Sequence, residues 1–210
     1  MTRKHSTLEL EAPGGETEIL LHVCCAPCSS AIVEYLLEHD IRPTLFYYNP
    51  NIFPNKEYEI RKKECLRYAQ MSGLDFIDAD YDHDKWLDKV RGLENEPERG
   101  ARCLRCFKER LVAAAMYASE HRFRVLATTL AASRWKSLEQ ITEAGEYAVT
   151  YFPKLTFWAQ NWRKGGLSER RNELVRLYEF YNQSYCGCEY SMKNRMENVK
   201  NVPTETYKKE

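Results

Sequence analysis

Short apolar segments alternate with longer amphipathic segments along most of the chain. The apolar segments have the length and composition of strands, and most of the amphipathic ones carry apolar residues at helical spacing. The predicted strands cover residues 19–23, 43–49, 74–80 and 125–130. The predicted helices cover residues 31–39, 55–73, 84–91, 103–121 and 137–149. This alternation predicts an α/β fold, a Rossmann-like parallel sheet with helices on both faces.

The chain of 210 residues has the length of one domain. Its first 18 residues are polar, contain a Gly-Gly pair and show no periodicity, so we expect a flexible N-terminal tail. We expect a single α/β metalloenzyme domain over residues 19–195 and a polar C-terminal tail over residues 196–210. Ser29 or Ser30 is the predicted cap of the first helix.

The 31 basic residues balance the 31 acidic ones, so any surface for a polyanion must be a local patch. The sequence contains no run of 18 apolar residues, and its beginning lacks the apolar core of a signal peptide. We therefore expect a cytoplasmic protein that does not contact a membrane.

Eight cysteines are many for a cytoplasmic protein, in which clustered thiols more often bind metal or carry redox chemistry than form structural disulfides. Cys65 stands alone on a predicted helix and is interpreted as a small buried apolar residue. The other seven fall into three groups: Cys24, Cys25 and Cys28; Cys103 and Cys106; Cys186 and Cys188.

The first two groups supply up to five thiolates, enough for a tetrahedral zinc ion or a four-iron cluster. A vicinal pair with a spare thiol favours a cluster over a closed zinc site. Both groups lie near predicted helix starts, where the helix dipole stabilises thiolates. The preceding His22 is interpreted as a core histidine.

The carboxyl ends of parallel strands share one edge of the sheet, where ligands gather. We expect three segments to meet there: residues 24–28, 78–82 and 128–136. The aspartates of the second segment are interpreted mainly as helix caps or solvated carboxylates. In the third segment, Arg134 and Lys136 form a cationic loop.

The Cys186-Gly187-Cys188 segment allows two interpretations. A disulfide across one residue closes a strained, easily reduced ring, so the pair can cycle as a redox-active dithiol. Alternatively, one or both sulfurs bind a second metal.

Just before this pair, the segment from Asn161 to Gln183 turns at Gly165 and Gly166 and continues into a predicted helix that carries Arg170, Arg171 and Arg176. Its interleaved aromatic and cationic side chains can stack on bases and neutralise phosphates, or they form a solvated helix face.

Six segments, taken in order, resemble the cobalamin-independent epoxyqueuosine reductases. The resemblance runs from about Ile19 to about Met192. It is carried by HVCCAPCS (22–29), YYNPNIFPNKEYEIRKKE (47–64), GLENEPERGARCLRCFKERL (92–111), TTLAASRWK (128–136), NWRKGGLSERR (161–171) and FYNQSYCGCEYS (180–191).

This resemblance implies a fold related to nucleotide-binding (HUP-like) hydrolases, a 4Fe-4S cluster and no cobalamin. Its implied reaction is the reduction of epoxyqueuosine to queuosine at the wobble position of tRNAs with a GUN anticodon, those for Asp, Asn, His and Tyr. An electron donor is required as a further partner. The implied cluster ligands are Cys24, Cys25, Cys103 and Cys106, with Cys28 as an alternative ligand.

The same resemblance makes Cys186 and Cys188 the catalytic redox pair or the ligands of a second, mononuclear iron. The expected substrate-binding residues are Arg134, Lys136, Trp162, Arg163, Lys164 and Arg171. A competing interpretation is a zinc-stabilised tRNA-binding or sulfur-transfer protein that uses the same thiolates without net reduction.

Overall fold

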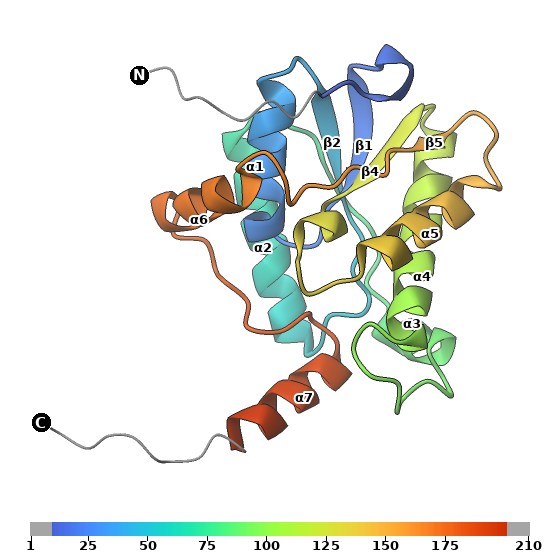
Figure 1. Cartoon of the computed structure of the whole chain (residues 1–210), viewed down its shortest axis with the longest axis vertical. Helices are drawn as coiled ribbons and strands as arrows, with labels where there is room; N and C mark the ends of the chain where they lie inside the picture. Colours follow the sequence, from blue (N-terminus) through green and yellow to red (C-terminus); the bar gives the residue numbers. More distant parts are fainter. Residues whose placement is uncertain (1–9, 201–210) are drawn as a thin grey trace, which may run out of the picture.

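A five-stranded parallel sheet forms the centre of the computed structural model, which describes residues 10–200 (Figure 1). The strand order is β3-β2-β1-β4-β5, and every neighbouring pair is parallel. The predicted α/β class is thereby confirmed, while the relation to HUP-like hydrolases stays a prediction. The strands are β1 (Glu18–His22), β2 (Arg42–Tyr47), β3 (Phe76–Asp78), β4 (Val125–Thr128) and β5 (Thr156–Phe157).

Helices cover both faces of this sheet. On one face α1 (Ala26–Leu37) and α2 (Asn55–Met71) pack together, with α6 (Leu167–Leu177) against α1. On the other face α4 (Ala101–Glu120) packs along α5 (Leu138–Val149). The remaining elements are η1 (Pro13–Gly15), α3 (His83–Lys89), η2 (Thr129–Ala132) and α7 (Glu189–Lys200).

The central strand β1 is buried from Ile19 to His22, because helices cover it on both sides. This explains why its sequence is continuously apolar instead of alternating. The change from this apolar run to the cysteines before α1 therefore marks the point where the chain reaches the carboxyl edge of the sheet.

Helix α1 begins earlier than the sequence pattern predicts. It starts at Ala26, with Cys25 at the N-cap position and Pro27 in the first turn, where the fixed φ of proline suits a helix. Ser29 and Ser30 lie inside the helix, so the prediction that one of them caps it is wrong. The hydroxyl of Ser29 instead donates to the Cys25 carbonyl at 2.6 Å. Cys28 is consequently a helical residue rather than a loop residue.

Besides the short η1 and η2, one strand and one α-helix were absent from the prediction. Strand β5 has two residues at a sheet edge, too few for a period, and α7 has a polar sequence without a clear apolar face. Within the predicted N-terminal tail, Ala12 is only 3% exposed. The domain boundaries stay predictions, since residues 1–9 and 201–210 lie outside the described range, as does most of the expected C-terminal tail.

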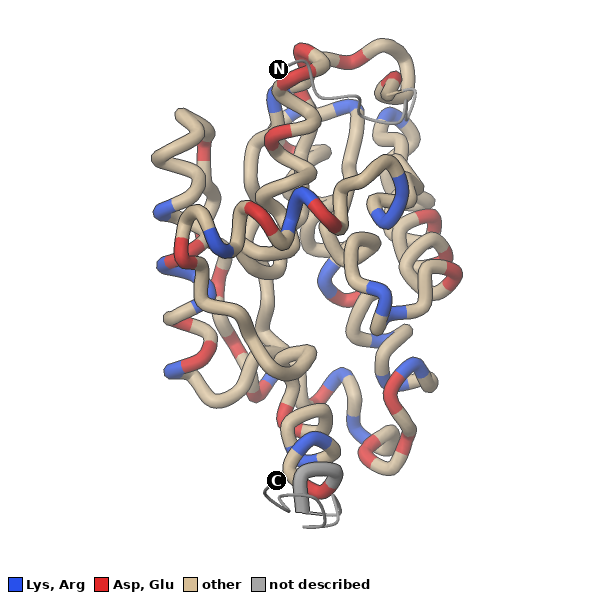
Figure 2. The backbone as a smooth tube through the Cα atoms, turned by 60° about the vertical axis from the view of Figure 1, so that its left-hand side comes forward, with Lys and Arg blue, Asp and Glu red and all other residues tan. Residues whose placement is uncertain are grey.

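Basic and acidic residues are interspersed over the described fold (Figure 2), as the balanced composition suggests. No helix within residues 10–200 combines the length and the apolar character needed to cross a membrane.

Close packing of α5 on β5 generates a first prediction. A Cβ atom at Gly145 would overlap the ring of Phe157. We expect Gly145→Ala to destabilise the protein by about 1–3 kcal/mol through overpacking, more than alanine gains in helix propensity. Thermal unfolding should detect a Tm lowered by several degrees.

The neighbouring, exposed Glu146→Ala is the matched control and should leave Tm almost unchanged. Combining Gly145→Ala with Phe157→Leu should recover part of the loss. An unchanged Tm in the single Gly145→Ala variant would contradict the packing argument.

Candidate metal centre

Three thiols gather where β1 passes into α1. The sulfurs of Cys24, Cys25 and Cys28 all lie within 4.8 Å of one another, and those of Cys24 and Cys25 are 3.8 Å apart. Cys24 follows the buried strand, Cys25 is the N-cap of α1, and Cys28 lies in its first turn. The N-terminal end of a helix stabilises negative charge, so this position favours thiolates.

The protons of this triad are unevenly shared. Hydrogen bonds from Cys25, and then from Cys28, hold the pKa of Cys24 well below its ordinary value. Burial raises the pKa of Cys25, and donation to Cys24 raises that of Cys28 to about 11. Cys24 is therefore the first thiolate of the triad, and metal binding would displace the protons of the other two.

The triad also receives hydrogen bonds from outside α1. The side-chain amide of Gln183 donates to the Cys25 sulfur at 2.8 Å, and the hydroxyl of Thr129 lies 3.7 Å from the Cys24 sulfur. Thr129 begins η2, directly after β4, so the segments after β1 and β4 meet as predicted. Gln183 links the triad to the segment that carries Cys186 and Cys188.

Cys103 and Cys106 occupy the first two turns of α4. The backbone N–H of Arg99 donates to the Cys103 sulfur at 3.3 Å. Burial, together with the charges of the nearby Cys186 and Cys188, raises the pKa of Cys103 to about 11 and that of Cys106 to about 12. Cys106 and Cys188 also pack in one small cluster with Trp86 and Val90. The second and third cysteine groups are therefore neighbours.

The Cys-Gly-Cys segment is fixed on the loop that follows β2. Arg61 donates to the carbonyls of Cys186 at 3.0 Å and Tyr185 at 3.3 Å, while the Phe53 N–H donates to Gly187 at 2.9 Å. Gly187 has φ +139°, a conformation that side chains rarely adopt, and a Cβ there would press on Arg61. Glycine is therefore required between the two cysteines.

Several cations surround the thiols. Buried Arg110 binds the side-chain oxygen of Asn49, and buried Arg102 donates to the carbonyls of Leu93 and Glu94. Within the described residues neither arginine forms an ion pair with a carboxylate. Burial lowers the pKa of Lys136, but the charges of Cys186 and Cys24 outweigh burial and raise it.

Buried cations without carboxylate partners require another source of negative charge. Thiolates bound to a metal or to an iron–sulfur cluster supply that charge, so the donor set fits such a group. The thiols that lie together are Cys24, Cys25 and Cys28 on one side and Cys103, Cys106, Cys186 and Cys188 on the other. The assignment of four of these as cluster ligands stays a prediction.

The residues interpreted from the sequence as structural rather than chemical have structural surroundings. His22 is buried between Thr128 and the Tyr48 carbonyl, and burial lowers its pKa to about 3, so it is a neutral core residue. Cys65 is buried. Asp82 caps α3 by accepting from the Lys85 N–H at 2.9 Å, and Asp78 pairs with Lys62.

The predicted substrate-binding residues are placed in different surroundings. Arg134 and Lys164 are exposed, and Arg171 donates to Asn182 at 3.1 Å. Trp162 is 1% exposed, with its indole N–H donating to the Thr128 carbonyl at 3.1 Å, so its ring supports the edge of the sheet from within the core. Arg163 binds backbone carbonyls between Ala131 and Lys136.

Sequence reasoning missed Arg61, Arg110 and Gln183. The sequence could have revealed Arg110, because it lies seven residues after Cys103 and four after Cys106, on the same face of a predicted helix. Nothing local marks Arg61 or Gln183, whose roles come from contacts between distant segments.

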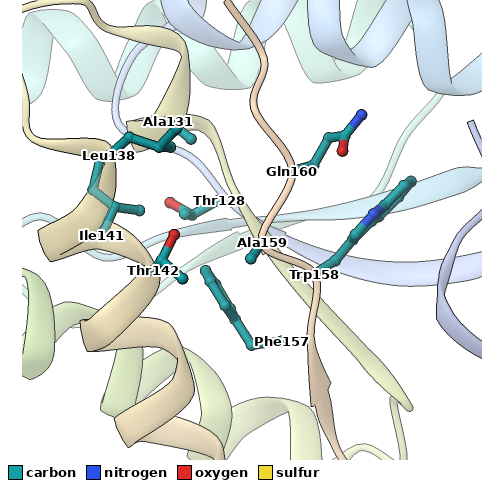
Figure 3. Close-up of a pocket in the computed structure, with 9 residues that line it drawn as sticks. All are labelled: Thr128, Ala131, Leu138, Ile141, Thr142, Phe157, Trp158, Ala159 and Gln160. Atoms are coloured by element: carbon teal, nitrogen blue, oxygen red, sulfur yellow. The ribbon is translucent and has the colours of Figure 1, made fainter. Parts of the chain in front are cut away.

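A separate hollow lies between α5, η2 and residues 157–160 (Figure 3). Its side chains are apolar or uncharged, among them Ile141, Thr142 and Phe157, and it contains no cysteine. The chemistry of the protein is therefore to be sought at the thiols.

The parallel α/β fold with clustered thiols at its carboxyl edge defines the class: a cysteine-rich α/β protein with the donors of a metal centre. A sequence profile described as "Epoxyqueuosine reductase QueH" matches residues 19–194. The chain belongs to the epoxyqueuosine reductase QueH family, and this membership identifies it as an oxidoreductase.

Curated relatives named epoxyqueuosine reductase QueH cover most of the chain. The protein of Acinetobacter baylyi is 46% identical over 187 residues, which is 89% of this chain and 86% of the relative. That of Histophilus somni is 47% identical over 186 residues, 89% of this chain and 76% of the relative. That of Thermotoga maritima is 32% identical over 187 residues, 85% of this chain and 92% of the relative.

The unpaired charge of Arg110 generates a prediction about metal retention. We expect Arg110→Met to retain iron about tenfold or more weakly, because an interaction with charged groups worth about 1.5–3 kcal/mol is lost. Iron bound after anaerobic reconstitution, measured against a competing chelator, tests this.

Arg105→Met is the matched control, since Arg105 lies on the same helix but is exposed. Thermal unfolding of both variants verifies folding. A folded Arg110→Met variant with wild-type iron retention would show that this charge does not balance the thiolates.

Proposed function

We propose that this protein reduces epoxyqueuosine to queuosine at the wobble position of tRNA. Family membership supports the reaction. The observation that carries the proposal is the pair of thiol groups among buried cations, one at the start of α1 and the other at the start of α4 beside the Cys-Gly-Cys segment. Acid–base side chains cannot perform this reduction alone, since opening an epoxide to an alkene consumes two electrons and two protons and releases water.

The donor set supports a 4Fe-4S cluster held by Cys24, Cys25, Cys103 and Cys106, with Cys28 as the alternative ligand. Such a cluster, when bound, supplies one-electron transfer to the substrate. Cys186 and Cys188 either cycle as a dithiol and disulfide or bind a second, mononuclear iron. The N–H of Arg99 and the amide of Gln183 orient individual sulfurs.

The residues around the thiols hold the site and its charge. Arg110 and Lys136 offset the thiolate charge, and Arg61 fixes the position of Cys186 through its carbonyl. The substrate is a tRNA with a GUN anticodon, of the Asp, Asn, His and Tyr type, which we place with the enzyme in the cytoplasm. Electrons come from an external donor.

Reduction of tRNA tests this function directly. Anaerobically reconstituted protein, given a low-potential chemical reductant and tRNA that contains epoxyqueuosine, should convert the nucleoside to queuosine, as read by nucleoside mass spectrometry. Protein that binds stoichiometric zinc, lacks iron–sulfur absorption and gives no queuosine would instead support the zinc-stabilised tRNA-binding or sulfur-transfer alternative.

Separate variants of the Cys-Gly-Cys pair generate a further prediction. Cys186→Ala and Cys188→Ala should each lower reductase turnover by at least about 100-fold, because either role requires its sulfur. Cys65→Ala is the matched control, a buried cysteine outside the three groups. Turnover by Cys188→Ala comparable to that of Cys65→Ala would remove the pair from the reaction.

A further inference from the structure

Trp135 is the most exposed large apolar side chain of the described residues. Its exposed fraction is 70%, whereas Trp86, Trp158 and Trp162 are 2%, 8% and 1% exposed. An exposed tryptophan leaves a large aromatic face in water, which burial would favour. The residues around Trp135 therefore indicate what kind of molecule could bind its exposed ring.

The loop that carries Trp135 is held by two arginines. Arg163 donates to the carbonyls of Ala131 at 3.1 Å, Ser133 at 2.6 Å and Lys136 at 2.9 Å. Arg99 donates to those of Arg134 at 3.0 Å and Trp135 at 2.9 Å. The backbone carbonyls are thus bound to the protein, and the exposure of Trp135 belongs to a fixed loop.

This loop lies directly beside the thiols. The same Arg99 that binds the Trp135 carbonyl through its side chain donates its backbone N–H to the Cys103 sulfur at 3.3 Å. The charges of Cys186 and Cys24 raise the pKa of Lys136, the next residue, although burial lowers it. Trp135 therefore lies at the margin of the candidate metal centre, on a loop that Arg99 joins to the Cys103 thiol.

The side chains offered at this margin suit a nucleic-acid strand. The guanidinium of Arg134 lies 5.2 Å from the centre of the Trp135 ring, and both side chains are exposed. An aromatic face beside a cation can stack on an unpaired base and contact the adjacent phosphate. A double helix offers no free base face, so the chemistry selects a single-stranded loop.

We propose that Trp135 stacks on an unpaired base of the substrate's RNA loop, with Arg134 on a neighbouring phosphate and Arg99 and Arg163 as positioning residues for the loop. The proposal rests on the proposed function, which makes tRNA the substrate. It adds the contact that holds the anticodon loop over the thiols. A docking protein that donates electrons is the competing partner for the same face.

Fluorescence can observe this contact, because the other three tryptophans are buried. The probe is a synthetic RNA hairpin with a GUN sequence in its loop, titrated into anaerobically reconstituted protein at fixed salt. We expect the hairpin to protect the wild-type emission from quenching by acrylamide. The same RNA annealed to its complement should give little protection.

Affinity for the hairpin gives the second measurement. Trp135→Ala should weaken binding by about 5- to 150-fold, the range expected for loss of one stacked base. Trp135→Phe, which keeps an aromatic face, should recover most of the affinity. Tyr151→Ala is the matched control, since Tyr151 is also exposed but follows the far end of α5.

Iron content and thermal unfolding must match wild type for each variant. Wild-type affinity in a folded Trp135→Ala variant would overturn the stacking proposal and leave the proposed function intact. If the Trp135→Ala variant bound RNA normally but lost turnover only when a protein supplied the electrons, Trp135 would be a contact for that donor protein and the stacking proposal would be wrong. Failure of the wild type to bind any hairpin would contradict the proposed function itself.

Discussion

Balance between thiolate charge and buried cations is the constraint on which the site depends. Cys24, Cys25 and Cys28 form one group of thiols, and Cys186 and Cys188 lie near Cys103 and Cys106. Thiolates within each group would repel, and within the described residues Arg110 and Arg102 are buried without carboxylate partners. Each set of charges is costly alone, and together they offset one another. The hydrogen bonds that these two arginines donate go to neutral oxygens, which leaves their charge available to the sulfurs.

The parallel sheet makes this concentration of thiols possible. Cys24 follows the central strand, η2 follows its neighbour β4, and both segments leave the sheet at the same edge. The first turns of α1 and α4 then place two cysteine groups at helix N-termini. The Cys-Gly-Cys segment leads directly into α7, whose Met192 N–H donates to the Cys188 carbonyl at 3.1 Å, and Arg61 and Phe53 also hold the segment through its backbone carbonyls.

Local pattern predicted the sheet and most of its helices, because apolar runs and helical spacing report burial directly. It also singled out seven cysteines for chemistry, since vicinal and paired thiols are rare in cores, and their individual roles stay predictions. It could not predict how the thiols are grouped, because the proximity of Cys106 to Cys188 depends on where the segment after α6 lies in the folded chain. The start of α1 was missed because Cys-Cys-Ala-Pro-Cys resembles a loop in isolation.

Trp162 and Trp135 also show what sequence pattern cannot predict. Both tryptophans have cationic residues beside them in the sequence, and the sequence alone does not tell which ring lies in the core. The structure buries Trp162 under Thr128 and exposes Trp135 on a loop bound by Arg99. Because Arg99 also donates to the Cys103 sulfur, a shift of the loop on binding would move a donor at the thiol. Arg99 therefore connects the loop of Trp135 to the Cys103 thiol.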